Sequence, residues 1–269
     1  MKKILVLLLI FYLLLTSILV VYSNNHSTLS NKYRPIRGGI EINQWKFHYT
    51  SGYTLGNGCS IGYPAIVYGI RGYVTAGHCF NGQISGINWE GHVFQPSRFI
   101  NNSYAGAPLI VDGDFYNTDS AFVEYYDVSS NLMTRVSGIW INAQITDYYS
   151  WNEIHFGNIL FGLTIYKTGI NTTVTSTYVY SYRSYLLKYE YDDGIWRLFK
   201  YIIYIPNLYA GKGDSGGPVY TLETYYLDGM LAGNASLVGI VIGKKGSDTM
   251  VISVDGIRYE IGISPIIGG

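Results

Sequence analysis

Residues 212–218 read KGDSGGP and residues 72–79 read GYVTAGHC, and these two short stretches are the most informative part of the chain. In the first, Ser215 is a single hydroxyl among three glycines. A nucleophilic serine needs small neighbours, so that a substrate carbonyl can approach and backbone N–H groups can converge on the developing oxyanion. The second stretch brings His78 to the end of an apolar strand. Each alone fits a glycine-rich turn or a structural histidine, but together they predict a serine nucleophile with a histidine base.

The composition favours β structure and excludes several classes of protein. Charged residues make up 13% of the chain, about half of what is usual, which excludes a coiled coil or a charged disordered chain. Lys plus Arg equals Asp plus Glu at 18 each, so the chain lacks the basic excess of a nucleic-acid-binding protein. With 28 Tyr and 32 Gly, the composition is typical of strands joined by tight turns. We expect a mostly β protein with no nucleic-acid partner.

The first residues carry an export signal. Residues 4–22 are nearly all apolar and follow Lys2 and Lys3, which is the order of charged and apolar regions in a signal peptide. Two interpretations remain open: residues 1–23 are a cleaved signal peptide, or they are a retained membrane anchor, because residues 4–22 are nearly long enough to span a bilayer. Under either one, the remainder lies outside the cytoplasm, secreted or anchored. Membrane contact is expected only through residues 4–22, if they are not cleaved.

Residues 24–35 are polar and without pattern, which suggests a linker or a short pro-segment before a folded part that begins near Ile36. Cys59 and Cys79 are the only cysteines, and in an exported chain a close pair is expected to form a disulfide. The five histidines are scattered, so the sequence predicts no zinc site.

Short apolar or alternating runs recur between turn signals from Ile36 onward, with the spacing of a barrel or a sandwich. Residues 185–204 predict a hairpin around Asp192-Asp193-Gly194. No run shows a sustained helical period with caps, and no repeat of fixed period is visible.

The sequence resembles the chymotrypsin-like serine proteases, most closely the α-lytic protease and streptogrisin branch. TAGHC around His78 and GDSGGP around Ser215 are similar to the two signatures of that family, in the same order and at a similar distance. Residues 36–41, 59–63 and 167–173 also resemble segments of the branch.

The resemblance implies an all-β fold of two six-stranded antiparallel β-barrels of the chymotrypsin type, with the active site in the cleft between them. We assign residues 36–134 to the first barrel, with His78, and residues 135–269 to the second, with Ser215.

A carboxylate must orient the histidine and stabilise its cation. Residues 119–123, DSAFV, resemble the Asp-x-Ala-aromatic-Val form of the branch and begin an apolar strand that would bury the carboxylate. The other acids of this region are Asp112, Asp114 and Asp127, and a solvated loop position fits the first two better. The expected triad is therefore His78, Asp119 and Ser215, in the chain order of chymotrypsin.

By the same resemblance, the N–H groups of Gly213 and Ser215 form the oxyanion hole. Residues 132–136, LMTRV, resemble the connection between the barrels, so Arg135 is expected to pair with Asp214 and hold the oxyanion loop open. The sequence also departs from the family, because Ile242 stands where a serine usually donates to the triad carboxylate.

The resemblance builds the primary substrate pocket from Tyr209, Ala210 and Gly211 and from Ile242, Gly243 and Lys244. Family members that cleave after Arg or Lys have an Asp at the position of Tyr209. A basic side chain would meet no countercharge here, so trypsin-like cleavage is not expected. The Lys244 stem would favour small or medium apolar side chains, whereas in the alternative its ammonium draws an acidic side chain.

These observations predict a secreted or outward-facing serine endopeptidase that hydrolyses peptide bonds in protein or peptide substrates through an acyl-enzyme, without a metal or other cofactor. Esters are not excluded as additional substrates. The alternative is a noncatalytic protease-like binding or surface module. Such relatives usually lose a triad residue, and this chain has all three.

Overall fold

The structure is a computed structural model that describes residues 28–48, 52–55, 58–80, 87–95, 103–112, 117–192 and 195–268. The signal peptide or anchor expected over residues 1–23 lies outside these residues, as do residues 24–27 of the expected linker. Within the described ranges, no helix is both long enough and apolar enough to cross a membrane.

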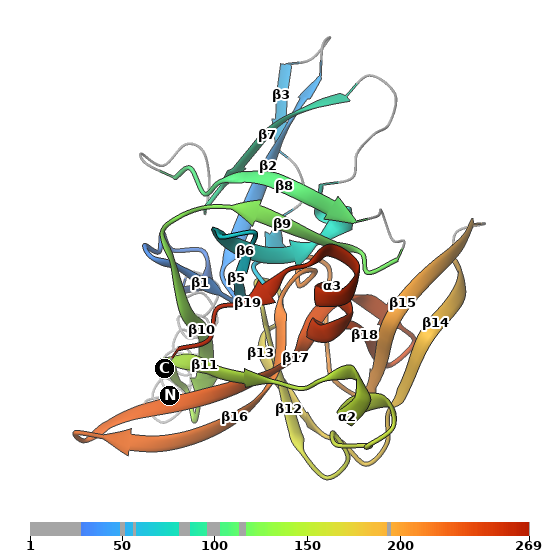
Figure 1. Cartoon of the computed structure of the whole chain (residues 1–269). Coiled ribbons are helices and arrows are strands. Elements are labelled where there is room, and N and C mark those ends of the chain that lie inside the picture. The colour runs from blue at the N-terminus through green and yellow to red at the C-terminus, as the bar shows by residue number, and fades with distance from the viewer. Residues whose placement is uncertain are drawn as a thin grey trace, which may run out of the picture.

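The N-terminal half of the chain forms two sheets, which lie above the C-terminal half in the view of Figure 1. One sheet has the order β19-β5-β6-β9-β8, and the other has the order β3-β2-β4 with β7 beside β2. The strands are β2 (Glu41–His48), β3 (Gly52–Leu55), β4 (Cys59–Ser60), β5 (Pro64–Val67), β6 (Ile70–Ala76), β7 (Ile87–Phe94), β8 (Ala107–Asp112), β9 (Ser120–Glu124) and β19 (Ser264–Pro265).

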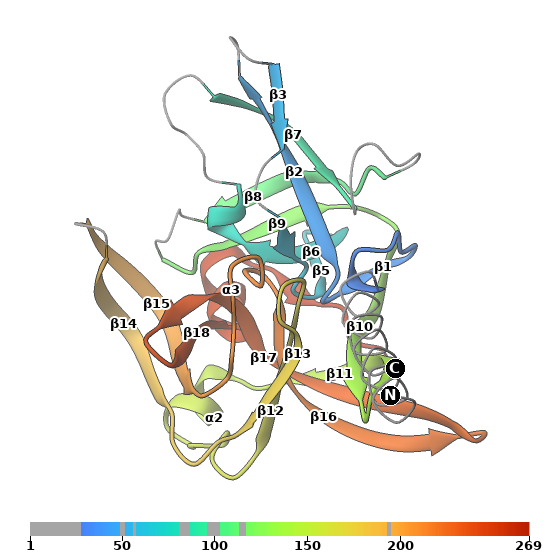
Figure 2. The same cartoon turned by 180° about the vertical axis from the view of Figure 1, so that it is seen from behind.

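The C-terminal half, together with β1 from the beginning of the described chain, forms one large sheet with the order β1-β10-β11-β17-β16-β12-β13. From β17 it continues through β18 and β15 to β14, whose hairpin with β15 is visible in Figure 2. The strands are β1 (Ile36–Gly38), β10 (Val128–Val136), β11 (Ile139–Tyr148), β12 (Thr164–Gly169), β13 (Thr173–Tyr178), β14 (Arg183–Asp192), β15 (Ile195–Pro206), β16 (Pro218–Leu227), β17 (Met230–Lys245) and β18 (Asp248–Ser253).

The mostly β fold and the hairpin around residues 185–204 are confirmed, the hairpin as β14 and β15. The predicted antiparallel arrangement is not complete, because β1 pairs with β10 and β11 pairs with β17 in parallel. The described strands form sheets of ten, five and four strands, so the count of two six-stranded barrels stays a prediction.

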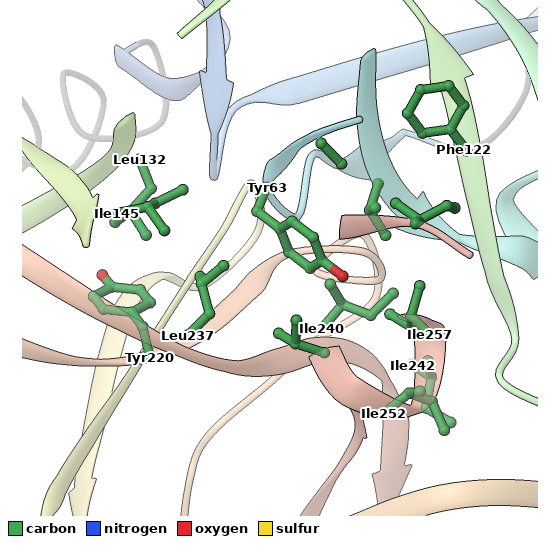
Figure 3. Packing of buried hydrophobic residues seen from close by; sticks show 14 of the residues in the cluster. Tyr63, Phe122, Leu132, Ile145, Tyr220, Leu237, Ile240, Ile242, Ile252 and Ile257 are labelled. Atoms are coloured by element: carbon green, nitrogen blue, oxygen red, sulfur yellow. The ribbon is translucent and has the colours of Figure 1, made fainter. Parts of the chain in front are cut away.

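A large hydrophobic cluster joins the two halves. Tyr63 and Phe122 from the N-terminal half pack with Leu237, Ile240 and Ile257 from the C-terminal half, and Figure 3 shows these side chains near Tyr63. Burying each large apolar side chain stabilises the fold by about 1.5–3 kcal/mol. The expected boundary between residues 134 and 135 lies within β10, and the division into two units stays a prediction.

The structure packs residues 28–35 against the N-terminal sheets. Leu29 is fully buried, the Tyr33 N–H donates to Gln95 Oε1 at 2.8 Å, and Arg34 Nη2 donates to the Tyr104 carbonyl at 2.8 Å. The described part of the expected linker is thus fixed to the fold, although its sequence is polar.

Two helices were missed by the sequence pattern: α2 (Trp151–His155) and α3 (Val254–Ile261). Both carry ordinary caps. Ser150 and Glu153 form a capping box at α2, while the Ser253 hydroxyl accepts from the Gly256 N–H at α3 and Gly262 ends that helix with φ 72°. Each is too short to produce a sustained apolar period, so only the caps could have revealed it.

Candidate active site

The pairing of β6 with β9 brings His78 and Asp119 together. Ala76 faces Ser120 in the antiparallel ladder, and the Gly77 N–H then donates to the Asp119 carbonyl at 2.8 Å. The next residue, His78, is the middle residue of a short 3-10 turn (η1, Gly77–Cys79) and donates its N–H to Asp119 Oδ1 at 2.7 Å. His78 Nδ1 lies 2.7 Å from Asp119 Oδ2. Both carboxylate oxygens therefore face one histidine.

This pair is sheltered from water. The side chain of Asp119 is fully buried and that of His78 is 12% exposed. A hydrogen bond to a buried carboxylate is stronger in such a setting than in water. A carboxylate at Nδ1 also fixes the orientation of the ring and leaves Nε2 as the nitrogen that can take a proton, which is the geometry a general base needs.

The predicted disulfide between Cys59 and Cys79 is confirmed, with 6.4 Å between the two Cα atoms. Cys79 belongs to the same 3-10 turn as His78, and both cysteines are buried. The bridge therefore fixes the turn that carries the histidine to β4, and through it to the strand β2 beside β4.

The Ser215 loop lies against the end of β6, the strand that precedes the His78 turn. Gly213 and Gly216 have φ of 99° and 84°, in the left-handed region that favours glycine. A Cβ added at Gly216 would be 2.2 Å from Thr75 Oγ1 and 2.9 Å from the Ala76 nitrogen, so only glycine allows this close approach. The two sequence motifs are thus neighbours in space.

Hydrogen bonds hold the backbone of the loop. The Ser60 N–H donates to the Ser215 carbonyl at 2.8 Å, and the Ser60 hydroxyl donates to the Gly213 carbonyl at 3.0 Å. The Asp214 carbonyl accepts from the Gly217 N–H at 2.8 Å. Because the peptide is planar and trans, the Ser215 N–H points away from that bond. Between Ser215 and His78, both of which are described, the structure forms no hydrogen bond.

The predicted pair of Arg135 with Asp214 is wrong. Asp214 Oδ2 instead accepts from Lys167 Nζ at 2.8 Å, and both side chains are fully buried. Lys167 lies on β12 opposite Val219 of β16, the strand that follows the serine loop. The lysine therefore reaches the carboxylate directly beside Ser215.

Arg135 lies at the β10–β11 turn. Its Nε donates to the Gly138 carbonyl at 3.0 Å, and its guanidinium carbon is 5.9 Å from the centre of the Trp140 ring. Strand pairing explains this position, because Arg135 faces Trp140 across the ladder, near the end of the hairpin.

The buried carboxylate of Asp214 has an unusually full set of donors. Oδ1 accepts from the N–H groups of Asn171 at 2.9 Å and Thr172 at 3.1 Å, and Oδ2 also accepts from the Gly211 N–H at 2.8 Å. Burial alone would raise the pKa of Asp214, but the charge and hydrogen bond of Lys167 outweigh it and hold this pKa below its ordinary value. Burial lowers the pKa of Lys167, and Asp214 opposes that shift.

The residues predicted to line the substrate pocket divide into two groups. Tyr209 and Lys244 meet, with Lys244 Nζ 5.8 Å from the centre of the exposed Tyr209 ring. Beside them Gly243 has open space where a side chain would be. Ala210 is 4% exposed and Ile242 is 2% exposed, and Ile242 belongs to the hydrophobic cluster that joins the two halves.

The other acids of the Asp119 region have identifiable places. Asp112 ends β8 and accepts from the backbone N–H of Thr118 at 3.2 Å, so the expectation of a solvated loop position is wrong for it. The Asp127 carbonyl accepts from the Ile36 N–H at 2.8 Å, while Asp114 lies outside the described residues. In the described ranges, no three His, Cys, Asp or Glu residues gather as metal ligands would.

Sequence reasoning missed Lys167, although the pattern contained a signal. Ile165 and Lys167 lie on the same face of β12 and both are buried. A lysine on the buried face of a strand needs a partner of opposite charge, and an acid beside the serine was available.

Solved bacterial proteases share this fold. The Nocardiopsis protease is 17% identical, with a TM-score of 0.52, and the alignment covers 86% of this chain and 98% of that one. Thermobifida fusca protease A is also 17% identical, with a TM-score of 0.52 and coverage of 87% and 99%. A glutamic-acid-specific serine protease that uses a histidine triad in substrate binding is 21% identical, with a TM-score of 0.53 and coverage of 86% and 100%.

No protein-family model and no curated protein sequence matches the chain. The structural likeness therefore establishes the fold, which is the chymotrypsin-like fold of these bacterial serine proteases.

Proposed function

We propose that the protein is a serine endopeptidase that acts outside the cytoplasm and hydrolyses peptide bonds through an acyl-enzyme. Ser215 attacks the scissile carbonyl, and His78 takes the proton and returns it to the leaving amine. Asp119 orients His78 and stabilises its cation. The observation that carries this proposal is the buried Asp119 carboxylate, whose two oxygens both lie 2.7 Å from nitrogens of His78.

The oxyanion of the tetrahedral intermediate would be bound by the N–H groups of Gly213 and Ser215. Support comes from the backbone of this loop, where Gly213 has φ 99° and the Ser60 hydroxyl holds its carbonyl. The Lys167–Asp214 pair supports the same loop from the buried side, at 2.8 Å. An endopeptidase with these parts needs no proteolytic step to form its oxyanion hole.

Ser215 and His78 belong to segments that lie against each other, but the two residues are not hydrogen-bonded in the described structure. In enzymes without substrate, catalytic hydrogen bonds are often long and shorten only when substrate binds. The proposal therefore places the formation of the Ser215–His78 hydrogen bond in the substrate complex.

Cleavage is expected after residues other than Arg and Lys. Tyr209 and Lys244 supply an aromatic ring and a positive charge at the proposed pocket, and an ammonium disfavours a second one nearby. Small or medium apolar residues fit beside the Lys244 stem, and an acidic residue fits its charge. One of the structural neighbours is described as glutamic-acid-specific, which makes the acidic substrate worth testing.

A peptide-library digest with purified protein tests both parts of this proposal. Cleavage that is absent in Ser215→Ala establishes the activity, and the residues found before the cut establish the pocket. No cleavage by the wild type contradicts the endopeptidase and favours a noncatalytic binding module. Cleavage confined to Arg and Lys contradicts the pocket assignment alone.

A further inference from the structure

The backbone that leads into Asp119 adopts an unusual conformation. Asn117 and Asp119 have φ of 51° and 39°, both in the left-handed region that L-residues rarely occupy. Such a conformation persists only where surrounding contacts determine it. Both Thr118 and Asp119 are fully buried, so these contacts come from the protein itself.

On one side the contacts come from Asp112, at the end of β8. Its Oδ2 accepts from the Thr118 hydroxyl at 2.5 Å and from the Thr118 N–H at 3.2 Å, and its Oδ1 accepts from Asn117 Nδ2 at 3.3 Å. The Thr118 and Ser120 hydroxyls lie 2.8 Å apart. Because Thr118 donates to Asp112, it accepts from Ser120. The two neighbours of Asp119 in the chain thus belong to one hydrogen-bonded row that ends on the Asp112 carboxylate.

On the other side the contacts come from β15, far away in the sequence. The Asn117 N–H donates to the Leu198 carbonyl at 2.7 Å, and the Lys200 N–H donates to the Asn117 carbonyl at 2.8 Å. These two bonds form a parallel bridge between Asn117 and Phe199, which is buried in the cluster that joins the halves. The β14–β15 hairpin is therefore a fixed support for the loop.

We propose that Asp112 and β15 form a two-sided clamp on this loop and that Thr118 is the positioning residue through which the clamp sets the carboxylate of Asp119 against His78. The inference rests on the proposed function, since it assigns a role within the same site. Asp119 Oδ2 lies 2.7 Å from His78 Nδ1, and a small rotation of the loop would lengthen this contact. The imidazolium that forms during the reaction would then lose stabilisation, which lowers the turnover rate.

Thr118→Val tests the clamp because it removes the hydroxyl that donates to Asp112 and keeps the shape of the side chain. We expect kcat to fall by about tenfold to hundredfold with little change in KM, since misplacement of a catalytic group has effects of this size. The NMR resonance of the His78 Nδ1 proton, assigned by comparison with His78→Asn, should shift as well, because its hydrogen bond to Asp119 changes. Thr118→Ser keeps the hydroxyl and should restore both values. Thr224→Val makes the same chemical change at an exposed site on β16 and should alter neither.

A double-mutant cycle separates the clamp from ordinary stability. Asp112→Asn and Thr118→Val act on one row of hydrogen bonds, so their effects on kcat should be strongly non-additive. If Thr118→Val lowers the unfolding midpoint but leaves the resonance of the His78 Nδ1 proton and kcat unchanged, the loop is merely structural and the proposal is overturned. If Thr118→Val does not fold, Asp112→Asn is judged by the same two readouts. The NMR measurement does not need activity, so a wild type that hydrolyses nothing refutes the proposed function, while the resonance still decides the clamp.

Discussion

At the scale of single residues, the catalytic candidates could be predicted and one of their supports could not. His78, Asp119 and Ser215 lie in short sequence motifs, and such motifs can be recognised without knowledge of the tertiary contacts around them. The partner of Asp214 depends on which buried side chain reaches it, and that depends on the pairing of β12 with β16, residues far apart in the sequence. The resemblance predicted Arg135 as the ion-pair partner of Asp214, whereas in the structure the partner is Lys167.

Lys167→Met should destabilise the protein and abolish activity. The substitution leaves the Asp214 carboxylate buried without its cation, and breaking a buried ion pair from one side costs about 3–5 kcal/mol. Arg135→Ala is the matched control, because this side chain lies at the β10–β11 turn and should have little effect. Denaturant unfolding measures the stability of each variant, and peptide hydrolysis measures its activity. Equal losses in the two variants would show that the ion pair is assigned wrongly.

The pKa of Asp214 also predicts how stability responds to acid. Its pKa is lower in the folded protein than the ordinary value of 3.8, so the unfolded chain binds a proton at a higher pH than the folded one. The stabilisation that ionised Asp214 gives to the folded state is complete when the pH is above the ordinary pKa of 3.8. It is lost as the pH falls through the pKa of the folded protein. Unfolding free energies between neutral pH and pH of about 2 should therefore fall more steeply in the wild type than in Lys167→Met/Asp214→Asn. Parallel curves would contradict the assignment.

At the scale of elements, strands could be predicted and helices could not. Short apolar or alternating runs predicted strands from Ile36 onward and the hairpin that forms β14 and β15, because a period of two is visible over a few residues. The helices α2 and α3 are short and are defined mainly by their caps, Ser150 with Glu153 and Ser253 with Gly262.

The disulfide acts at this scale, because it joins β4 to the turn that carries His78. Replacing both Cys59 and Cys79 by serine should lower the free energy of unfolding by about 3 kcal/mol, the loop-closure effect for a separation of 20 residues. Activity should fall further than the folded fraction does, because the His78 turn loses its tether. Reductant added to the wild type is the control and should reproduce the change. Unaltered stability in both would mean that the bridge contributes nothing.

At the scale of the whole molecule, the sequence predicted a β protein but not how its halves meet. Tyr63, just before β5, and Ile240, in β17, are ordinary apolar residues of their own segments, and no local pattern indicates that they belong to one cluster. The same holds for Asn117 and Phe199, whose bridge ties the Asp119 loop to the C-terminal half. Such contacts arise from tertiary packing between residues that are distant in the chain. The site consequently depends on both halves being folded together.

The central claim is that Ser215 is an activated nucleophile, and covalent labelling tests it most directly. An organophosphonate should react with the wild-type protein at Ser215, identified by mass spectrometry of the labelled peptide. Reaction should be abolished in Ser215→Ala and strongly slowed in His78→Ala, because the hydroxyl then lacks its base. If the folded wild type is not labelled, or if it is labelled equally well without His78, the account of this site as a serine protease active site is wrong.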